Sequence, residues 1–576
     1  MSKKAIKTIS TFLAAGIILT GCSFEKNKSK DELLIEGAKL TAENNSRGAI
    51  VLLKSALEKD ENFYQARFQL AKAYYNSDKF EAAEKELQKV LRQNPNLKDA
   101  HMELARVYVQ NNRPDDALKE ISEYGKDISG DAEALEVSSW AHAQKGEKTL
   151  AVDLLKKAVA LNTPGSTAGV SLASLYMQMN RNDDAKSLLL DVTSKDSSNT
   201  KALQMLAWIQ MSENKPDEAL DTYDKILKIS PSDSEALFKK GVLLVDMGKL
   251  DPALAMADRL SQSYPKRPEG YRLRGVVLFH KKDYDNTVTQ LQKSLAIQPN
   301  VGAYYILGLA HFYRNEPELA ISQFQKALDL NPSLVQARIL VSMIFMKQKR
   351  IDDSITEIKK ALDVDEENAL AHNILGNAYM IQGKTDEGFK ELTRAIELDP
   401  KLIDAHLNKG LINLSKGKTK EAEIELRAAV NVAPNFLNTR YILAAYYIKQ
   451  KNYPKALQSL KDGITGKKED ALLYNSASAI LFAEKKPAEA LEYLNKAKAA
   501  NPDYFAPYYN IANYYAAKSD YDRAINEYAE VLKRDPKNAG ALINTAALYE
   551  VKGKKDDAVT YYNKARETGE PTAFLA

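Results

Sequence analysis

The sequence predicts an all-α protein, a solenoid of about sixteen helix-turn-helix repeats. Two recurring patterns support this: small residues return every 34 positions, and prolines stand near the end of many repeats. The composition agrees, because alanine and tyrosine recur throughout while the 576 residues include only 25 glycines and 19 prolines. With 44% hydrophobic and 27% charged residues, the chain has ample apolar surface to bury.

The charge distribution argues against a nucleic-acid partner. The 81 basic and 77 acidic side chains leave a formal net charge of +4, and no block of them is long enough to form a basic patch. The charges are interspersed along the predicted helix faces, which is typical of a solvated exterior.

The first residues have the pattern of an export signal. Lys3, Lys4 and Lys7 precede an apolar run over residues 9–19. This run is shorter than the ~20 helical residues that span a bilayer, but it suits the apolar region of a secretory signal peptide. We therefore expect residues 1–21 to be an export signal, and the cysteine that follows them indicates a lipoprotein signal peptide.

The signal ends in Leu19-Thr20-Gly21-Cys22, which resembles the bacterial lipobox, and Cys22 is the only cysteine in the chain. The resemblance implies that Cys22 is lipidated through its thiolate and becomes the first residue of the mature protein. The alternative is a lone structural cysteine within the signal. Ser23 follows, where an aspartate would resemble the inner-membrane retention signal, so outer-membrane sorting is expected. Residues 22–29 are then the lipidated cysteine and a solvated tether.

Small residues define two positions of the repeat. The first small position is occupied by Gly37, Ala71, Ala105, Ser139, Ala173, Ala207, Gly241, Gly275, Gly308, Ser342, Gly376, Gly410, Ala444, Ser478, Ala512 and Ala546. The second lies twelve residues later and is occupied by Ala49, Ala83, Ala117, Ala151, Ala185, Ala219, Ala253, Thr287, Ala320, Ser354, Gly388, Ala422, Ala456, Ala490, Ala524 and Ala558. We predict that the two helices of a hairpin cross at these positions, where larger side chains would separate the backbones.

Turn and loop residues complete the repeat. Between the two small positions stand residues that tolerate left-handed backbone, namely Asn44, Asn112, Gly146, Gly248, Gly383, Gly417 and Gly553. Prolines are expected to end one hairpin and begin the next at Pro95, Pro231, Pro265, Pro299, Pro332, Pro400, Pro434, Pro502 and Pro536.

The spacing resembles the tetratricopeptide repeat (TPR), whose large, Leu-Gly, aromatic, Ala, aromatic and Pro positions correspond to Tyr304, Leu307, Gly308, His311, Ala320, Phe324, Ala327 and Pro332. The resemblance covers residues 30–572 in sixteen repeats and leaves 573–576 as a tail. It implies a right-handed superhelix whose concave face is lined by the first helix of every pair. Two copies are weaker: the one around Ser139, with His142 in the aromatic slot, and the one around Ser478, preceded by Lys468 where proline is expected.

No catalytic, metal or cofactor motif interrupts the repeats, so we expect a protein that is not an enzyme and needs no cofactor. The six histidines form no His-x-x-x-His pair and have no companion cysteine, which gives zinc little support. Three of them, His101, His372 and His406, share one repeat position, which marks them as helix-packing or groove residues.

The candidate partner-binding groove lies in the C-terminal half. First-helix positions that point inward in TPR proteins hold Asn373, Asn377, Asn408, Asn475, Asn510, Asn513 and Asn544. Side-chain amides both donate and accept hydrogen bonds, so a row of them can grip the backbone of an extended peptide or the hydroxyls of a glycan. Tyr441 and Tyr509 beside them suit stacking on flat ligand surfaces. The alternative is that these residues only solvate the groove.

Two pairs in this row, Asn377 with Asn408 and Asn513 with Asn544, resemble part of the carboxylate clamp of chaperone-binding TPR domains. The lysine and arginine of that clamp are missing, since Tyr509 and Asn373 stand at the matching positions. A ligand held by its C-terminal carboxylate is therefore not expected.

The first two repeats resemble a particular group of lipoproteins. Residues 48–60, 66–71 and 83–87 look like the opening of TPR lipoproteins encoded with exopolysaccharide and PEP-CTERM protein-sorting loci. This implies an outer-membrane-anchored, periplasm-facing scaffold whose partners are envelope proteins of an export or assembly machine, or a glycan. The alternative is a pilotin-like lipoprotein that assembles a secretin or type IV pilus.

Overall fold

The computed structural model describes residues 28–161 and 167–569, and over these residues the chain contains 32 α-helices and no strand. They form sixteen consecutive helix pairs, as the repeat spacing predicts, and we number the pairs as repeats 1 to 16. The predicted signal peptide, Cys22 and the tail 573–576 lie outside the described residues. No described helix is both long enough and apolar enough to cross a membrane.

The chain divides into two compact units, Met1–Lys281 and Lys282–Ala576. The first helices of the repeats in unit 1 are α2 (Lys30–Ala42), α4 (Tyr64–Tyr75), α6 (Lys98–Gln110), α8 (Ala132–Gln144), α10 (Ala168–Gln178), α12 (Thr200–Ser212), α14 (Ser234–Asp246) and α16 (Pro268–His280). The second helices of unit 1 are α3 (Ser46–Lys59), α5 (Phe80–Gln93), α7 (Pro114–Tyr124), α9 (Lys148–Ala160), α11 (Asn182–Lys195), α13 (Pro216–Ile229) and α15 (Leu250–Ser263).

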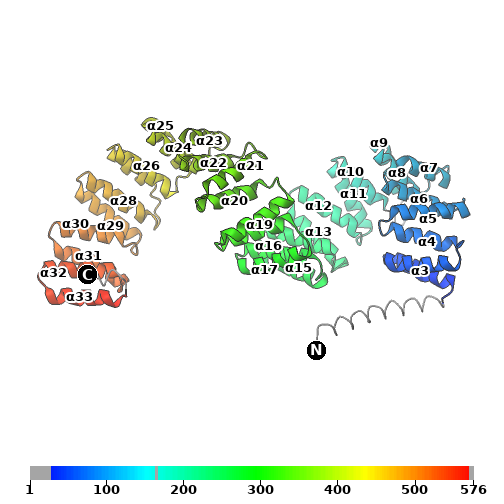
Figure 1. Cartoon of the computed structure of the whole chain (residues 1–576), viewed down its shortest axis with the longest axis horizontal. Coiled ribbons are helices and arrows are strands. Elements are labelled where there is room, and N and C mark those ends of the chain that lie inside the picture. The colour runs from blue at the N-terminus through cyan, green and yellow to red at the C-terminus, as the bar shows by residue number, and fades with distance from the viewer. Residues whose placement is uncertain (1–27, 162–166, 570–576) are drawn as a thin grey trace, which may run out of the picture. The chain divides into compact units, whose positions relative to one another are not determined.

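Unit 2 continues the alternation of first and second helices. Its first helices are α18 (Val301–Tyr313), α20 (Val335–Lys347), α22 (Ala369–Ile381), α24 (Ile403–Ser415), α26 (Leu437–Lys449), α28 (Asp470–Ala483), α30 (Ala506–Ala517) and α32 (Ala539–Val551). Its second helices are α17 (Tyr284–Ile297), α19 (Pro317–Leu330), α21 (Ile351–Leu362), α23 (Thr385–Leu398), α25 (Thr419–Val432), α27 (Tyr453–Lys461), α29 (Pro487–Ala500), α31 (Tyr521–Arg534) and α33 (Lys555–Glu567). Within each unit every helix packs against the next one in the chain (Figure 1).

Within each unit the small residues lie where the helices of a pair touch, as predicted. All sixteen residues at each of the two small positions are buried. In repeat 10 the hydroxyls of Ser342 and Ser354 are hydrogen-bonded across this contact at 2.7 Å. In repeat 9 a Cβ added to Gly308 would stand 2.6 Å from the ring of Phe324. The repeat therefore needs a small first-helix residue so that a large second-helix side chain can fill the contact.

Repeat 7 fills the same space differently. A Cβ on Gly241 would meet Leu273 of the following first helix α16, whereas no atom of the second helix α15 is among its nearest neighbours. The reason is that Ala257 stands in α15 at the position that Phe324 occupies in repeat 9. Leu273, which is 1% exposed, supplies the missing volume from the next repeat.

The turn between the two helices has left-handed backbone in every repeat. The seven predicted turn residues all have positive φ, for example 58° at Asn44 and 78° at Gly383. The same position is also left-handed at nine residues that were not predicted, namely Asp78, Asn180, Asn214, Lys282, Asn315, Lys349, Lys451, Lys485 and Ser519. Packing of the two helices therefore imposes this conformation even on lysine, which has no intrinsic preference for it.

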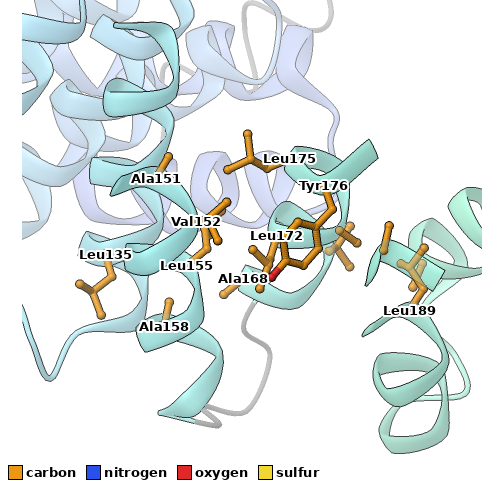
Figure 2. Close-up of a cluster of buried hydrophobic side chains, with 14 of the residues drawn as sticks. Leu135, Ala151, Val152, Leu155, Ala158, Ala168, Leu172, Leu175, Tyr176 and Leu189 are labelled. Atoms are coloured by element: carbon orange, nitrogen blue, oxygen red, sulfur yellow. The ribbon is translucent and has the colours of Figure 1, made fainter. Parts of the chain in front are cut away.

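Leucine, alanine and aromatic side chains form a series of buried clusters along each unit. In repeats 4 and 5, Val152 and Leu155 of α9 point toward Leu172 and Tyr176 of α10 (Figure 2). The predicted prolines lie just beyond the second helices; Pro332, for instance, follows α19, which ends at Leu330. Each proline thus ends one repeat and precedes the next first helix.

The weak copy around Ser478 is preceded by an irregular junction. Helix α27 has nine residues, whereas most second helices have fourteen. Asp470, at the start of α28, is 3% exposed and accepts backbone N–H bonds from Thr465, Gly466 and Lys467 at 2.5 to 3.1 Å. A buried carboxylate therefore holds this loop where the other repeats use a proline.

Candidate functional site

The predicted amide residues lie on the first helices α22, α24, α28, α30 and α32 of unit 2, and most of them are linked in pairs. Asn408 of α24 donates a hydrogen bond from Nδ2 to Oδ1 of Asn377 on α22 at 2.6 Å. Both side chains are partly exposed. The pair joins the first helices of repeats 11 and 12 on their accessible face.

A second pair repeats this arrangement between repeats 14 and 15. Asn510 of α30 donates from Nδ2 to Oδ1 of Asn475 on α28 at 2.8 Å. Asn475 in turn donates to the hydroxyl of Tyr504 at 3.4 Å, in the loop that precedes α30. The chain of three groups fixes the direction in which each amide points.

The third link, between repeats 15 and 16, runs through a tyrosine. The hydroxyl of Tyr528 on α31 donates to Oδ1 of Asn513 at 3.2 Å and accepts from Nδ2 of Asn544 at 3.2 Å. Sequence reasoning missed Tyr528, because it lies on a second helix at a position whose ordinary role is packing. Its ring is 3% exposed and only its hydroxyl serves the amides.

Each of the three links leaves one side-chain amide oxygen without a partner among the described residues. Among residues 28–161 and 167–569, no partner is found for the carbonyl oxygens Oδ1 of Asn408, Asn510 and Asn544. These three side chains are partly exposed, so their oxygens remain available to a donor from outside the chain. The linked amides therefore form a row of oriented acceptors on the first helices of repeats 12, 15 and 16.

Asn373 is placed differently from the other amides. It is 4% exposed, and its Oδ1 is buried without a hydrogen-bond partner among the described residues. It lies in the interior of repeat 11 and not on the open face. A ligand in the groove could therefore reach it only if the packing around it moved.

Tyr441 and Tyr509 are mainly packing residues in this structure. Burial, with the nearby Tyr528 and Asp535, raises the pKa of Tyr509 to about 12. The Tyr509 hydroxyl donates to Oδ1 of Asn538 at 2.7 Å, and its ring meets that of Tyr528 edge-on with 5.2 Å between centroids. Burial also raises the pKa of Tyr441, although a hydrogen bond with Ser476 acts against the increase. Both rings are half-buried, so only part of each is open for stacking.

The three histidines that share a repeat position pack between the helices of their own repeat. Nδ1 of His101, His372 and His406 lies 2.6 to 2.7 Å from a carboxylate oxygen of the second helix, on Glu120, Glu391 and Glu425 respectively. Nε2 of each lies 2.8 to 3.1 Å from a loop carbonyl, at Pro95, Glu366 and Pro400. Of the two roles that the sequence left open, the structure supports helix packing. Within the described residues no group of His, Cys, Asp and Glu side chains could hold a metal ion.

Sequence reasoning also missed the first helices of unit 1. Both tryptophans of the chain, Trp140 and Trp208, lie there and line two separate pockets. The signal that could have found them is their shared repeat position, one residue after the first small residue, which faces the same way as Asn377.

Comparisons with known proteins agree with the repeat architecture. Models described as tetratricopeptide repeat match residues 40–98, 86–138, 170–234, 210–276, 301–334, 403–436 and 509–571, and a model described as TPR repeat matches 376–417. Together these matches cover more than half of the chain. The uncharacterized protein ycf37 of Cyanophora paradoxa is 39% identical over 100 residues, which are 17% of this chain and 58% of that protein.

The chain is also similar to two solved structures. YrrB, described as a TPR protein with an unusual peptide-binding site, is 22% identical with a TM-score of 0.29, over 32% of this chain and 95% of that one. A chain of the APC/C hetero-tetramer Cut9–Hcn1 is 17% identical with a TM-score of 0.38, over 85% of this chain and 97% of that one.

Proposed function

The chain is a tetratricopeptide repeat protein, and we propose that it is a lipid-anchored envelope scaffold that holds an extended segment of a partner protein against the amide row of unit 2. TPR proteins generally mediate protein–protein interactions, and the fold is typically non-catalytic. The extended partner, the lipid anchor and the export pathway are proposed in addition to this general role.

The observation that carries the proposal is the row of oriented acceptors. Asn408, Asn510 and Asn544 each use their Nδ2 within the chain and keep Oδ1 free. An extended peptide presents backbone N–H groups at regular intervals and can donate one to each such oxygen without a demand on its side chains. The amides are held by their neighbours before a ligand arrives, so binding costs little side-chain entropy.

Affinity capture from an envelope extract tests the groove. In the triple variant N408A/N510A/N544A each lost hydrogen bond weakens binding by roughly 0.5 to 1.5 kcal/mol, so recovery of the partner falls markedly. The matched control is N431A/N495A/N563A, since these three asparagines are exposed on second helices and make no side-chain hydrogen bond within the described residues. Both variants are first checked for parental helicity. Equal recovery by parent and triple variant removes the groove from the proposal, and recovery of a glycan without protein changes the class of ligand.

The anchor is assigned to Cys22, in the pattern that resembles a lipobox, with the outer membrane as destination and the periplasm as the facing compartment. A single acyl chain holds a protein to a membrane only marginally, so stable retention requires more than one. Mass spectrometry of the mature amino terminus, with Cys22→Ser as the comparison, tests this assignment. An unmodified terminus, or a serine variant that still fractionates with the outer membrane, contradicts it.

The pathway is assigned to exopolysaccharide or protein export, on the likeness of residues 48–60, 66–71 and 83–87 in repeats 1 and 2. A strain that lacks the protein should lose surface polysaccharide or sorted proteins and keep its pili. Loss of pili with normal polysaccharide would instead favour the assembly lipoprotein. The captured partner of the groove experiment gives an independent answer.

A further inference from the structure

The tryptophan side chains of unit 1 mark a second accessible surface. Trp140 and Trp208, the only tryptophans in the sequence, occupy the same position of repeats 4 and 6 on the first helices α8 and α12. Trp208 is 52% exposed, and the neighbouring Met211 and Val242 are 38% and 37% exposed. A large aromatic residue left half uncovered beside other apolar side chains is typical of a contact surface.

A pocket of about 290 Å³ lies at Trp208, between the first helices α12 and α14. Trp208 and Met211 line it from α12, and Phe238 and Val242 line it from α14. Three charged residues also line the pocket: Glu235, Lys239 and Asp246. It therefore has apolar walls and a small number of charged groups, which is the usual make-up of a site for one side chain or a small ligand.

The charges at this pocket favour a cation. Within the part of the chain that the structure describes, neither Glu235 nor Asp246 forms an ion pair or a side-chain hydrogen bond. At the same repeat position Glu133 pairs with Arg106 and Glu269 with Arg267, whereas Asp31, Asp99 and Asp404 form no ion pair within the described residues. Lys239 offsets one of the two carboxylates, so the lining keeps one net negative charge.

The same aromatic wall already holds a guanidinium from within the chain. Arg272 of α16 places its guanidinium carbon 4.9 Å from the centroid of the Phe238 ring. The attraction between a cation and an aromatic ring is strongest when the ring is that of tryptophan, and it increases where water is excluded. Trp208 presents a larger aromatic surface than Phe238, and about half of its side chain remains exposed to solvent.

We propose that the pocket at Trp208 is a binding site for an arginine side chain of a partner protein. The guanidinium stacks on Trp208 and donates to Glu235 and Asp246, while the aliphatic stem lies along Met211 and Val242. Arginine suits this site better than lysine, because its planar cation is weakly hydrated and its stem covers apolar surface. An acidic side chain would be repelled by the net negative charge of the lining. The site lies in unit 1, so it is independent of the amide row in unit 2.

Tryptophan fluorescence tests the assignment, because Trp140→Phe leaves Trp208 as the single reporter in the full-length protein. Three N-acetylated pentapeptides serve as probes; they are identical alanine peptides except for arginine, citrulline or leucine at the centre. Citrulline keeps the shape of arginine without its charge. We expect the arginine peptide to change the emission of Trp208 saturably and to bind about tenfold more tightly than the other two.

A pair of charge-neutralising variants gives the second measurement. E235Q/D246N should weaken binding of the arginine peptide by about tenfold, since each lost charged acceptor removes a strong hydrogen bond. The control D153N/D221N has the same change in net charge at exposed second-helix residues that form no ion pair within the described chain, and it should leave the affinity unchanged. Equal affinity for the arginine and citrulline peptides, equal weakening in both double variants, or an emission of Trp208 that no peptide changes would each overturn the proposal.

Discussion

Asn408 donates a 2.6 Å hydrogen bond to Asn377, and this bond joins the first helices of two consecutive repeats on their accessible face. The same kind of link recurs between Asn510 and Asn475. Side chains that bridge neighbouring first helices fix both the spacing of the helices and the orientation of the amides, so the proposed groove is organised before a partner binds.

Replacement of Asn408 by alanine should have a small and local effect on stability. Both members of the pair are partly exposed, so water can satisfy Asn377 once its partner is lost, and the cost should be at the low end of the roughly 0.5 to 1.5 kcal/mol of a hydrogen bond. Amide hydrogen exchange of α22 and α24 measures it. Faster exchange confined to repeats 11 and 12 is the expected result, whereas global unfolding would show that the pair is structural.

Gly308→Leu should disrupt repeat 9, because even a Cβ at this position would lie 2.6 Å from the Phe324 ring. Overpacking of this kind costs roughly 1 to 3 kcal/mol, and Ala320→Leu, at the other side of the same contact, should behave alike. Gly302→Leu is the matched control, since Gly302 is exposed on the same helix α18. Thermal melting that ranks all three variants equally would contradict the packing described here.

Lys349→Gly should stabilise the turn of repeat 10. Lys349 has a φ of 61°, a conformation that costs a side-chain-bearing residue about 1 kcal/mol and costs glycine little. The reverse change in the next repeat, Gly383→Lys at a φ of 78°, should destabilise by a similar amount. Melting temperatures of the two variants should therefore move in opposite directions, and a shift of the same sign in both would refute the argument.

Stability around repeat 12 should fall as the pH rises above the ordinary histidine range. Both ring nitrogens of His406 face acceptors, Glu425 and the carbonyl of Pro400, so both must carry a proton. The hydrogen bond with Glu425 raises the pKa of His406 above its usual 6.5, against the opposing effect of burial and of Lys409. Protonation therefore stabilises the fold below pH 6.5, and this contribution is lost as the pH rises through the raised pKa.

The lower limit of this stabilisation is set by Glu425. Burial alone would raise the pKa of Glu425, but hydrogen bonds from His406 and Lys409 bring it below its usual 4.5. Its contribution is present above pH 4.5 and is lost as the pH falls through the lowered pKa. His406→Arg should remove the dependence above pH 6.5, since Arg338 at the same repeat position binds Glu357 and the carbonyl of Pro332. Hydrogen exchange of α24 and α25 between pH 6 and 8 measures the effect, and an unchanged profile in the arginine variant would count against it.

The repeat architecture could be predicted from the sequence because it depends on volume and backbone conformation. Gly308 and Ala320 are small because the two helices of repeat 9 touch there. The twelve-residue spacing between such positions identifies the helix hairpin in the sequence. The left-handed turn was predicted at five glycines and two asparagines, and Asn180, Asn214 and Asn315 carry the same signal and were missed. At Lys349 the residue type gives no such signal, because there the surrounding packing imposes a conformation that lysine does not favour.

The details of the candidate site depend on distances between repeats, which a residue pattern does not contain. The sequence placed Asn377, Asn408 and Asn510 on one helix face, yet their direct pairing follows from how closely consecutive first helices lie. Tyr528 was missed because its hydroxyl reaches the amides from a second helix. Asn373 shares the register of the groove residues, but the packing of repeat 11 buries it.

The left-handed turn at one position of all sixteen repeats also gives the molecule a fixed unit of length. Gain or loss of one complete 34-residue unit returns a small residue to each helix contact and leaves every other contact in place. Most other changes in length would bring large side chains into those contacts. A gene of this kind can therefore lengthen or shorten its binding face by duplication or deletion in steps of one helix pair, and the stretch of partner that it can hold changes in the same steps.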